Sequence, residues 1–263
     1  MQTATPVAAL LLTLSLNACQ QAEPGDVRTG AAAEDVAPGD SAAEHSDQAA
    51  TEDDSLPPPP TRQSETARDA GEKPREVMAE LGISEGGHVA DVMAGGGYYT
   101  YLLSDAVGSD GVVYATGAQM VSRRLEEGDL AGRTNIQVIE SLEEVPSGSL
   151  DAVLINRAYH LISDPGKTFF PALRHALKPG GRIGVIEVRL NAQTGHDMRT
   201  HRMGQETVRE EIESGGFRLV EASEILANPE DPGTDFLEGR RHLADRMFLV
   251  FEKPAETALA PRR

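Results

Sequence analysis

The chain has little cysteine, little positive charge and no long apolar run. Only one of its 263 residues is cysteine, and 24 Lys or Arg stand against 42 Asp or Glu, for a formal net charge of −18. A single cysteine excludes an intrachain disulfide. The excess of acids argues against a nucleic acid substrate, because phosphate backbones attract basic surfaces. The apolar stretch Val7–Leu16 is too short to span a bilayer as a mature helix.

That apolar stretch ends in Leu16-Asn17-Ala18-Cys19, which resembles the cleavage box of bacterial lipoproteins. We therefore predict a signal peptide over residues 1–18 and a lipid anchor at Cys19. Gln20 is similar to the residue that follows the cysteine in lipoproteins of the outer membrane, so we expect a lipid-anchored, periplasm-facing protein of the bacterial cell envelope. No Lys or Arg precedes Cys19, and an ordinary cleaved signal peptide remains the alternative.

The next segment, Gln20–Pro60, is rich in Ala, acidic residues, Gly and Pro and has no aromatic residue. It carries ten acidic residues against Arg28 alone, a net of −9, which is half of the formal charge of the chain. Such a segment cannot bury enough apolar surface to offset the entropy lost on ordering. We predict a disordered acidic spacer over residues 19–61, one folded domain over residues 62–256 and a short tail over residues 257–263.

Within the predicted domain, strands alternate with helices, which is typical of a parallel sheet covered on both faces. The runs Ala152–Ile155 and Ile183–Ile186 are apolar without alternation, as central parallel strands are. No helix is expected between the last two strands, so the last strand should insert antiparallel. The prediction is a Rossmann-like, doubly wound α/β fold with seven strands. We expect strands near residues 88–92, 111–116, 136–139, 150–156, 182–188, 217–222 and 246–251, and helices near 75–81, 98–106, 169–177 and 205–214.

The first predicted strand runs into Met93-Ala94-Gly95-Gly96-Gly97. Glycine lets the backbone bend with positive φ and lets a ligand lie against bare peptide N–H groups. The turn therefore predicts a site for a nucleotide-like cofactor, although a turn that only joins a strand to a helix would have the same composition. Thr100 occupies the place of the third glycine of the dinucleotide fingerprint, so a dinucleotide is not the favoured ligand.

Five motifs occur in a characteristic order: Asp91–Thr100, Tyr159-His160, His201-Arg202, Gly215-Gly216-Phe217 and Leu226–Asp231. Together they resemble a group of small bacterial predicted methyltransferases within the class I S-adenosylmethionine-dependent superfamily, over about Arg68 to Pro254. The resemblance implies S-adenosylmethionine as cofactor and methyl transfer to an unidentified small-molecule substrate. It implies cofactor contacts from Asp91, Ala94, Gly95, Gly97, Gly117 and Asn156.

The chain also departs from the superfamily pattern. Met93 stands where a glycine is usual, and Gly117 stands where an acid usually binds both ribose hydroxyls. Glu140, Ser141 and Glu143 are the candidates for the contact to adenine. S-adenosylmethionine is made in the cytosol, which an exported enzyme would have left. A second hypothesis is therefore a cofactor-eroded ligand-binding or interaction module of the envelope. A nicotinamide-dependent oxidoreductase is less favoured, because the third glycine and the ribose acid are both missing.

Catalytic chemistry is expected at the carboxyl edge of the sheet, where open α/β sheets bind ligands. Tyr159 and His160 follow the fourth strand there, and a neutral imidazole can take a proton from a substrate nucleophile. We predict catalytic roles for His160, Tyr159 and His201, with His201-Arg202 bordering the substrate pocket. Asp197 and His201 could share a helical face as metal ligands, but we predict no metal. The connection Glu224–Asp245 should fold over the sheet edge, and Asp69 should help to close the cofactor site.

Overall fold

The structure is a computed structural model that describes residues 58–236 and 241–255. The predicted signal peptide, Cys19, most of the predicted spacer and the predicted tail lie outside these residues. Among the described helices, none is long and apolar enough to cross a membrane.

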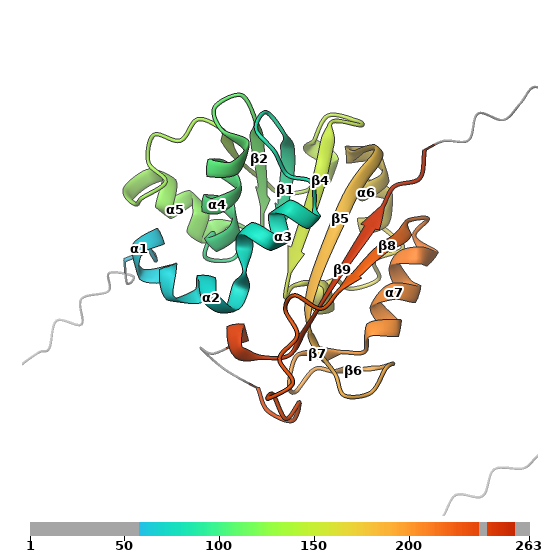
Figure 1. The fold of residues 1–263 in the computed structure, drawn as a ribbon. Coiled ribbons are helices and arrows are strands. Elements are labelled where there is room, and N and C mark those ends of the chain that lie inside the picture. The colour runs from blue at the N-terminus through green and yellow to red at the C-terminus, as the bar shows by residue number, and fades with distance from the viewer. Residues whose placement is uncertain (1–57, 237–240, 256–263) are drawn as a thin grey trace, which may run out of the picture. The chain divides into compact units, whose positions relative to one another are not determined.

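Seven main strands form one twisted sheet in the order β3-β2-β1-β4-β5-β9-β8 (Figure 1). β9 lies antiparallel between β5 and β8, whereas β1 to β5 pair in parallel. The predicted seven-stranded layout with an antiparallel last strand is confirmed. The strands are β1 (His88–Val92), β2 (Val112–Thr116), β3 (Ile136–Ile139), β4 (Leu150–Asn156), β5 (Leu177–Arg189), β8 (Arg218–Ser223) and β9 (Arg246–Glu252).

Helices cover both faces of the sheet (Figure 1). Successive residues of a strand point to opposite faces. Leu154 of β4 therefore packs in the cluster under α3, α4 and α5, and its neighbour Ile155 packs in the cluster under α6 and α7. The helices are α1 (Arg62–Glu65), η1 (Thr66–Arg68), α2 (Asp69–Glu72), α3 (Pro74–Glu80), α4 (Tyr98–Val107), α5 (Gln119–Glu127), η2 (Leu142–Glu144), η3 (Tyr159–Leu161), α6 (Phe169–Ala176), α7 (Gln205–Ser214) and η4 (Arg241–Leu243).

One segment differs from the expectation. Residues 196–203 form a hairpin of two short strands, β6 (His196–Asp197) and β7 (Arg202–Met203), rather than the helical turn on which the metal alternative depended. The Asp197 carboxylate accepts hydrogen bonds from the Arg199 N–H and the Thr200 hydroxyl, which favours a turn over a helix. β7 pairs with the end of β5, so the hairpin extends the carboxyl edge of the sheet.

Candidate functional site

The glycine turn lies at the carboxyl edge of β1 and is fixed to β2. Met93, Gly95 and Gly97 have φ values of 53°, 55° and 80°, all in the left-handed region that favours glycine. The Met93 N–H donates to Thr116 Oγ1 at 3.0 Å, and the Ala94 N–H donates to the Thr116 carbonyl at 2.9 Å. The turn is therefore held beside the ends of two parallel strands, as the sequence predicted.

A cavity of about 440 Å³ opens beside this turn, within the size range of small-molecule sites. Five of the six residues predicted to contact a cofactor line it, namely Asp91, Ala94, Gly95, Gly117 and Asn156. Gly97 does not line it, because it faces α5, where an added Cβ would lie 2.9 Å from Val121 Cγ2. The conformation of Gly97 therefore serves the packing of α4 on α5.

Two residues that line this cavity, Asp91 and Asn156, carry side-chain acceptors. Asp91 is buried and accepts a hydrogen bond of 2.6 Å from the Thr100 hydroxyl. Burial raises the pKa of Asp91 to about 6, against the opposing effect of Thr100. Asn156 Oδ1 is buried and has no hydrogen-bond partner among the described residues. A carboxylate and a vacant amide oxygen in one cavity fit a cationic donor such as an amino group.

The departures from the superfamily pattern lie together at one wall of the cavity. Gly117 has a φ of 56°, and an added Cβ would lie 3.3 Å from Met93 Cα, so a side chain at position 117 would be strained. Met93 also borders a second cavity of about 210 Å³, which is lined by the predicted adenine candidates Glu140, Ser141 and Glu143. Met93 thus stands between the two cavities.

The N-terminal segment from α1 to α2, which the sequence analysis did not resolve into helices, is fastened to the glycine turn. Arg124 of α5 is fully buried and donates to Glu65 at 3.0 Å, to Asp129 at 2.9 Å and to the Gly96 carbonyl at 2.8 Å. The Tyr98 hydroxyl donates to Asp69 at 2.7 Å, and Arg62, which also pairs with Asp69, keeps the pKa of that carboxyl low. These contacts place Asp69 beside the start of α4.

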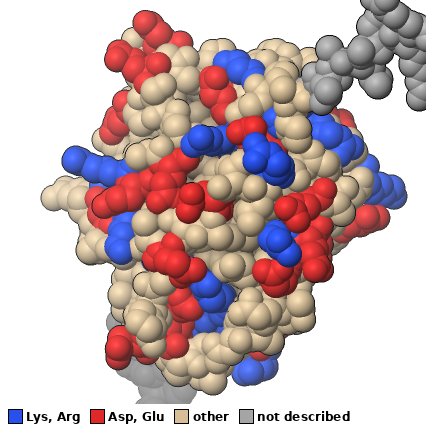
Figure 2. Space-filling view, turned by 45° about the vertical axis from the view of Figure 1, so that its right-hand side comes forward, with Lys and Arg blue, Asp and Glu red and all other residues tan. Residues whose placement is uncertain are grey.

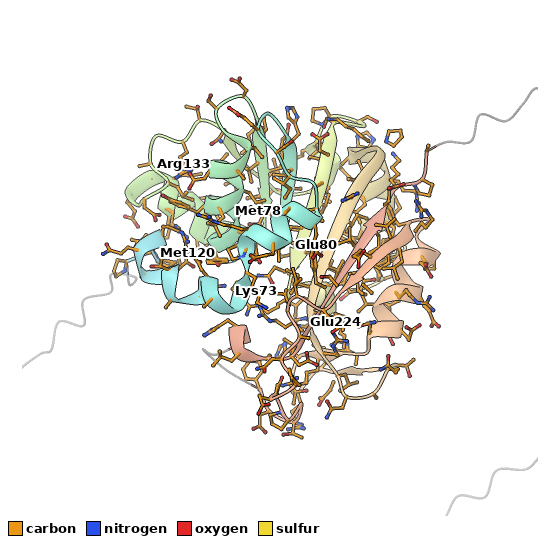
Figure 3. All side chains as sticks on the ribbon, in the orientation of Figure 1. Lys73, Met78, Glu80, Met120, Arg133 and Glu224 are labelled. Carbon is orange, nitrogen blue, oxygen red and sulfur yellow. The ribbon has the colours of Figure 1, made fainter. Side chains whose placement is uncertain are left out.

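At the far end of this segment, Lys73 lies between α2 and α3, as Figure 3 shows, and its Nζ donates to the Ile225 carbonyl at 2.6 Å. The buried Glu72 just before it forms ion pairs with Arg68 at 3.3 Å, Arg157 at 3.2 Å and Arg246 at 2.7 Å. Arg68 and Arg157 line the cavity of about 440 Å³. Sequence reasoning missed this cluster, because its members come from three separate segments and only Arg68 and Glu72, four residues apart, have a regular spacing.

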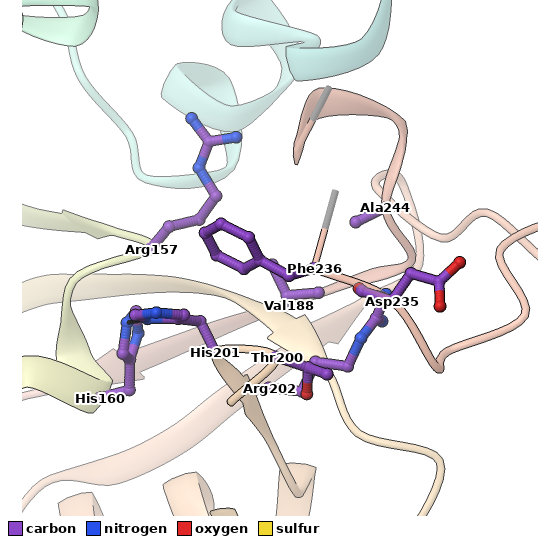
Figure 4. A pocket seen from close by; sticks show the side chains of 9 residues that line it. All are labelled: Arg157, His160, Val188, Thr200, His201, Arg202, Asp235, Phe236 and Ala244. Atoms are coloured by element: carbon purple, nitrogen blue, oxygen red, sulfur yellow. Dashed lines mark hydrogen bonds between the residues drawn. The ribbon is translucent and has the colours of Figure 1, made fainter. Parts of the chain in front are cut away.

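Two of the three predicted catalytic residues, His160 and His201, lie next to each other (Figure 4), and Glu187 extends this pair. His160 Nδ1 lies 3.1 Å from both carboxylate oxygens of Glu187, and His160 Nε2 lies 2.9 Å from His201 Nδ1. The backbone N–H of His160 also donates to Glu187, at 3.2 Å. A carboxylate on Nδ1 favours the tautomer that carries its proton there, which leaves Nε2 to accept from His201. Sequence reasoning missed Glu187, which lies near the carboxyl end of β5.

The histidine pair borders a small cavity of about 10 Å³, and Arg157 lines both this cavity and the larger one. Tyr159, the third predicted catalytic residue, lines neither of them. It is buried, and its hydroxyl donates to Glu211 of α7 at 2.9 Å. Adjacent residues of a 3₁₀ turn point in different directions, so Tyr159 and His160 separate although they are neighbours in sequence.

No protein-family model matches the chain. It is 27% identical over 183 residues to O-methyltransferase resE from Aspergillus sclerotiorum, a match that covers 62% of this chain and 67% of the relative. It resembles the crystal structure of a SAM-dependent methyltransferase from Aquifex aeolicus with a TM-score of 0.57 and 23% identity, over 76% of this chain and all of that one.

A further structural neighbour is 1,6-didemethyltoxoflavin-N1-methyltransferase from Burkholderia thailandensis, which was crystallised with S-adenosylhomocysteine. Its TM-score is 0.51 at 14% identity, over 73% of this chain and 80% of that one. These likenesses concern the arrangement of the sheet and helices, because a shared fold does not by itself fix an activity.

Proposed function

We propose that this chain, which has the fold of class I S-adenosylmethionine-dependent methyltransferases, transfers the methyl group of S-adenosylmethionine to a small-molecule acceptor. One observation carries the proposal: the cavity of about 440 Å³ combines the glycine turn with two acceptors, Asp91 and the unpartnered Asn156 Oδ1. The amino group of the cofactor is a donor of the kind that this pair lacks.

Asp91 and Asn156 would hold the amino-acid end of the cofactor, and the peptide groups of the glycine turn would lie against it. When bound, the cofactor supplies an electrophilic methyl group on a sulfonium. The chain must then accept the proton that the acceptor loses. The chain of Glu187, His160 and His201 suits this task, because the Glu187 carboxylate stabilises a positive charge on the imidazole pair without taking the proton itself.

Calorimetric titration of the full chain with S-adenosylhomocysteine and with NAD tests the proposal. We expect the first to bind and NAD not to bind. Asp91→Asn should weaken S-adenosylhomocysteine by about tenfold or more above pH 7, because it removes the charge that faces the ammonium group. Asp151→Asn is the matched control. Asp151 lies at the amino end of β4, at the sheet edge opposite to the site, and pairs with Lys178. Unchanged binding by the D91N variant would place the ligand elsewhere.

A ligand-binding module without methyl transfer is the second candidate. Met93 occupies the cavity wall with a φ of 53°, and Gly117 supplies no carboxylate for ribose. Failure of the wild type to bind either S-adenosylmethionine or S-adenosylhomocysteine would favour this candidate, and binding of NAD would favour an oxidoreductase.

We further propose that the protein is anchored to the bacterial envelope through Cys19, faces the periplasm and acts on no nucleic acid. The lipoprotein-like box at Leu16–Cys19 and the acidic segment behind it support the location. The net acidity of the chain supports the exclusion of nucleic acid. On the face drawn in Figure 2, acidic and basic side chains are interspersed and no continuous basic area is visible, which agrees with that exclusion.

A further inference from the structure

Arg157 occupies a distinctive position at the site. It follows β4 directly and lines the large cavity. It also lines the small cavity of the histidine pair, which Figure 4 shows. Its φ is 54°, in the left-handed region that non-glycine residues rarely adopt. The fold therefore holds Arg157 at the border of both cavities in a backbone conformation that its side chain disfavours.

The charge of Arg157 is poorly compensated. Among the described residues its guanidinium has one ion-pair partner, Glu72, which also serves Arg68 and Arg246. The two competitors have further partners: Arg68 pairs with Glu65 at 3.0 Å, and Arg246 donates to the carbonyls of Gly71 and His242. Asp91, the acidic residue that lines the large cavity, is hydrogen-bonded to Thr100 instead.

The electrostatics of the cluster point the same way. Burial lowers the pKa of Arg157, Glu72 opposes this, and Arg68 and Arg246 lower it further. A guanidinium presents five N–H donors in a planar fork that matches a carboxylate. A buried charge that shares its counterion with two other cations is stabilised strongly by an additional anion. An anion beside Arg157 would relieve both deficits.

We infer that the methyl acceptor is an acid whose carboxylate pairs with Arg157 while its nucleophilic atom faces His160 and His201. This inference rests on the proposed function. The cofactor has a carboxylate too, so the two sources must be separated. Arg157 borders the cavity of the proton-accepting histidines, and an anion there would lie between the cofactor and that pair, which favours the acceptor as its source.

The first arm measures nucleoside binding by calorimetry. The ligands are S-adenosylhomocysteine and 5′-methylthioadenosine, which lacks the amino-acid carboxylate. We expect Arg157→Met to bind each ligand within about twofold of the wild type. Arg133→Met is the matched control, because Arg133 pairs with Asp105 at 2.6 Å and lines neither of the two cavities. A loss of about tenfold or more for S-adenosylhomocysteine alone would assign Arg157 to the cofactor and overturn the inference.

The second arm measures the melting temperature in the presence of two acids, lactate and benzoate, and of their neutral counterparts, lactamide and benzamide. Each measurement is made at constant ionic strength, with and without S-adenosylhomocysteine. We expect the acids to stabilise the wild type and R133M but not R157M, with partial rescue by Arg157→Lys, which keeps the charge and loses the fork. Equal responses to acids and amides, no response in the wild type, or an unchanged response in R157M would each contradict the inference.

The two proposals fail separately in this design. Stabilisation by acids that depends on Arg157 in a protein that binds no S-adenosylhomocysteine would preserve the anion site and reject the methyltransferase function. Binding of S-adenosylhomocysteine without any effect of the acids would preserve the proposed function and reject the anion site at Arg157.

Discussion

Three residues around the two cavities adopt backbone conformations that their side chains disfavour. Met93, Arg157 and His201 have φ values of 53°, 54° and 54°, and each lines at least one of the cavities. Left-handed backbone in a non-glycine residue costs on the order of 1–2 kcal/mol and persists only where the surroundings enforce it. Of the five described non-glycine residues with positive φ, these three border the cavities, whereas Lys73 and Asp164 do not.

Substitution of Gly97 should show that this glycine of the turn is needed for the packing of α4 on α5. Gly97 and Gly132 have φ values of 80° and 81°, but an added Cβ meets Val121 Cγ2 at 2.9 Å only in the first case and nothing within 4 Å in the second. Gly132→Ala should lower the free energy of unfolding by about 1 kcal/mol through backbone strain alone. Gly97→Ala should lower it by about 1–3 kcal/mol more through overpacking. Equal losses in urea denaturation would contradict the packing role.

Asp91 should make stability depend on pH. Its folded pKa of about 6 lies above the ordinary 3.8, so the folded state binds this proton more tightly than the unfolded state does. The favourable contribution is complete below pH 4 and is lost as the pH rises to 6. Asp91→Asn should therefore stabilise the protein at pH 7.5 by on the order of 2–3 kcal/mol, and the gain should vanish near pH 4. Denaturation curves at both pH values measure this; a gain independent of pH would contradict it.

At the scale of elements, the N-terminal segment contributes Arg68 to the larger cavity, and the β6–β7 hairpin contributes His201 to the smaller one. The hairpin is held by the buried pair of Arg202 and Asp231 at 2.9 Å, and Arg202 also donates to the Asp235 carbonyl at 3.0 Å. These bonds join the connection after β8 to Arg202, which directly follows His201 in the hairpin. The expectation that this connection lies at the sheet edge agrees with its described part.

Arg124 should decide whether the N-terminal segment stays docked. Removing one partner of a buried ion-pair network leaves charges without compensation, at a cost of about 3–5 kcal/mol. Arg124→Met should therefore lower the free energy of unfolding by that amount, because Glu65 and Asp129 lose their shared cation. Arg123→Met, one residue earlier, breaks the pair with the more exposed Glu127 and should cost no more than about 1 kcal/mol.

Hydrogen exchange identifies the element involved. In R124M the amides of α1 and the glycine turn should exchange faster than in R123M. Similar exchange in the two variants would mean that the N-terminal segment is held by other contacts.

At the scale of the whole molecule, the formal charge is divided between the predicted spacer, with a net of −9 over residues 20–60, and the rest of the chain. A lipid anchor followed by a self-repelling acidic segment would hold the folded domain away from a membrane surface.

Cys19→Ser should release the protein from membranes. Each buried methylene of an acyl chain contributes about 0.8 kcal/mol, and more than one chain gives stable anchoring. We expect the wild type in the membrane fraction and the variant in the soluble fraction, with an acylated N-terminal cysteine found by mass spectrometry only in the wild type. An unmodified wild-type N-terminus, or a variant that still sediments with membranes, would contradict the anchor.

Local sequence patterns determined the fold class and the arrangement of the sheet. The apolar runs of β4 and β5, the glycine turn after β1 and the lack of an α-helical pattern before β9 are local features of the sequence. Of the described residues between β8 and β9, only the 3₁₀ turn η4 is helical. These local features were enough to predict the sheet, its antiparallel strand and the edge where the site lies. Periodicity and turn chemistry act between near neighbours, so they can be read without knowing what lies across the fold.

Tertiary structure decided which side chains meet. Glu72 and Arg246 lie 174 residues apart, and His160 and Glu187 lie 27 apart on different elements, so no spacing rule joins them. The direction of a side chain could not be predicted from the sequence either. Tyr159 points to α7, whereas its neighbour His160 contacts Glu187. Ion pairs and proton-transfer chains depend on distances of about 3 Å between remote segments, and only the packed fold sets such distances.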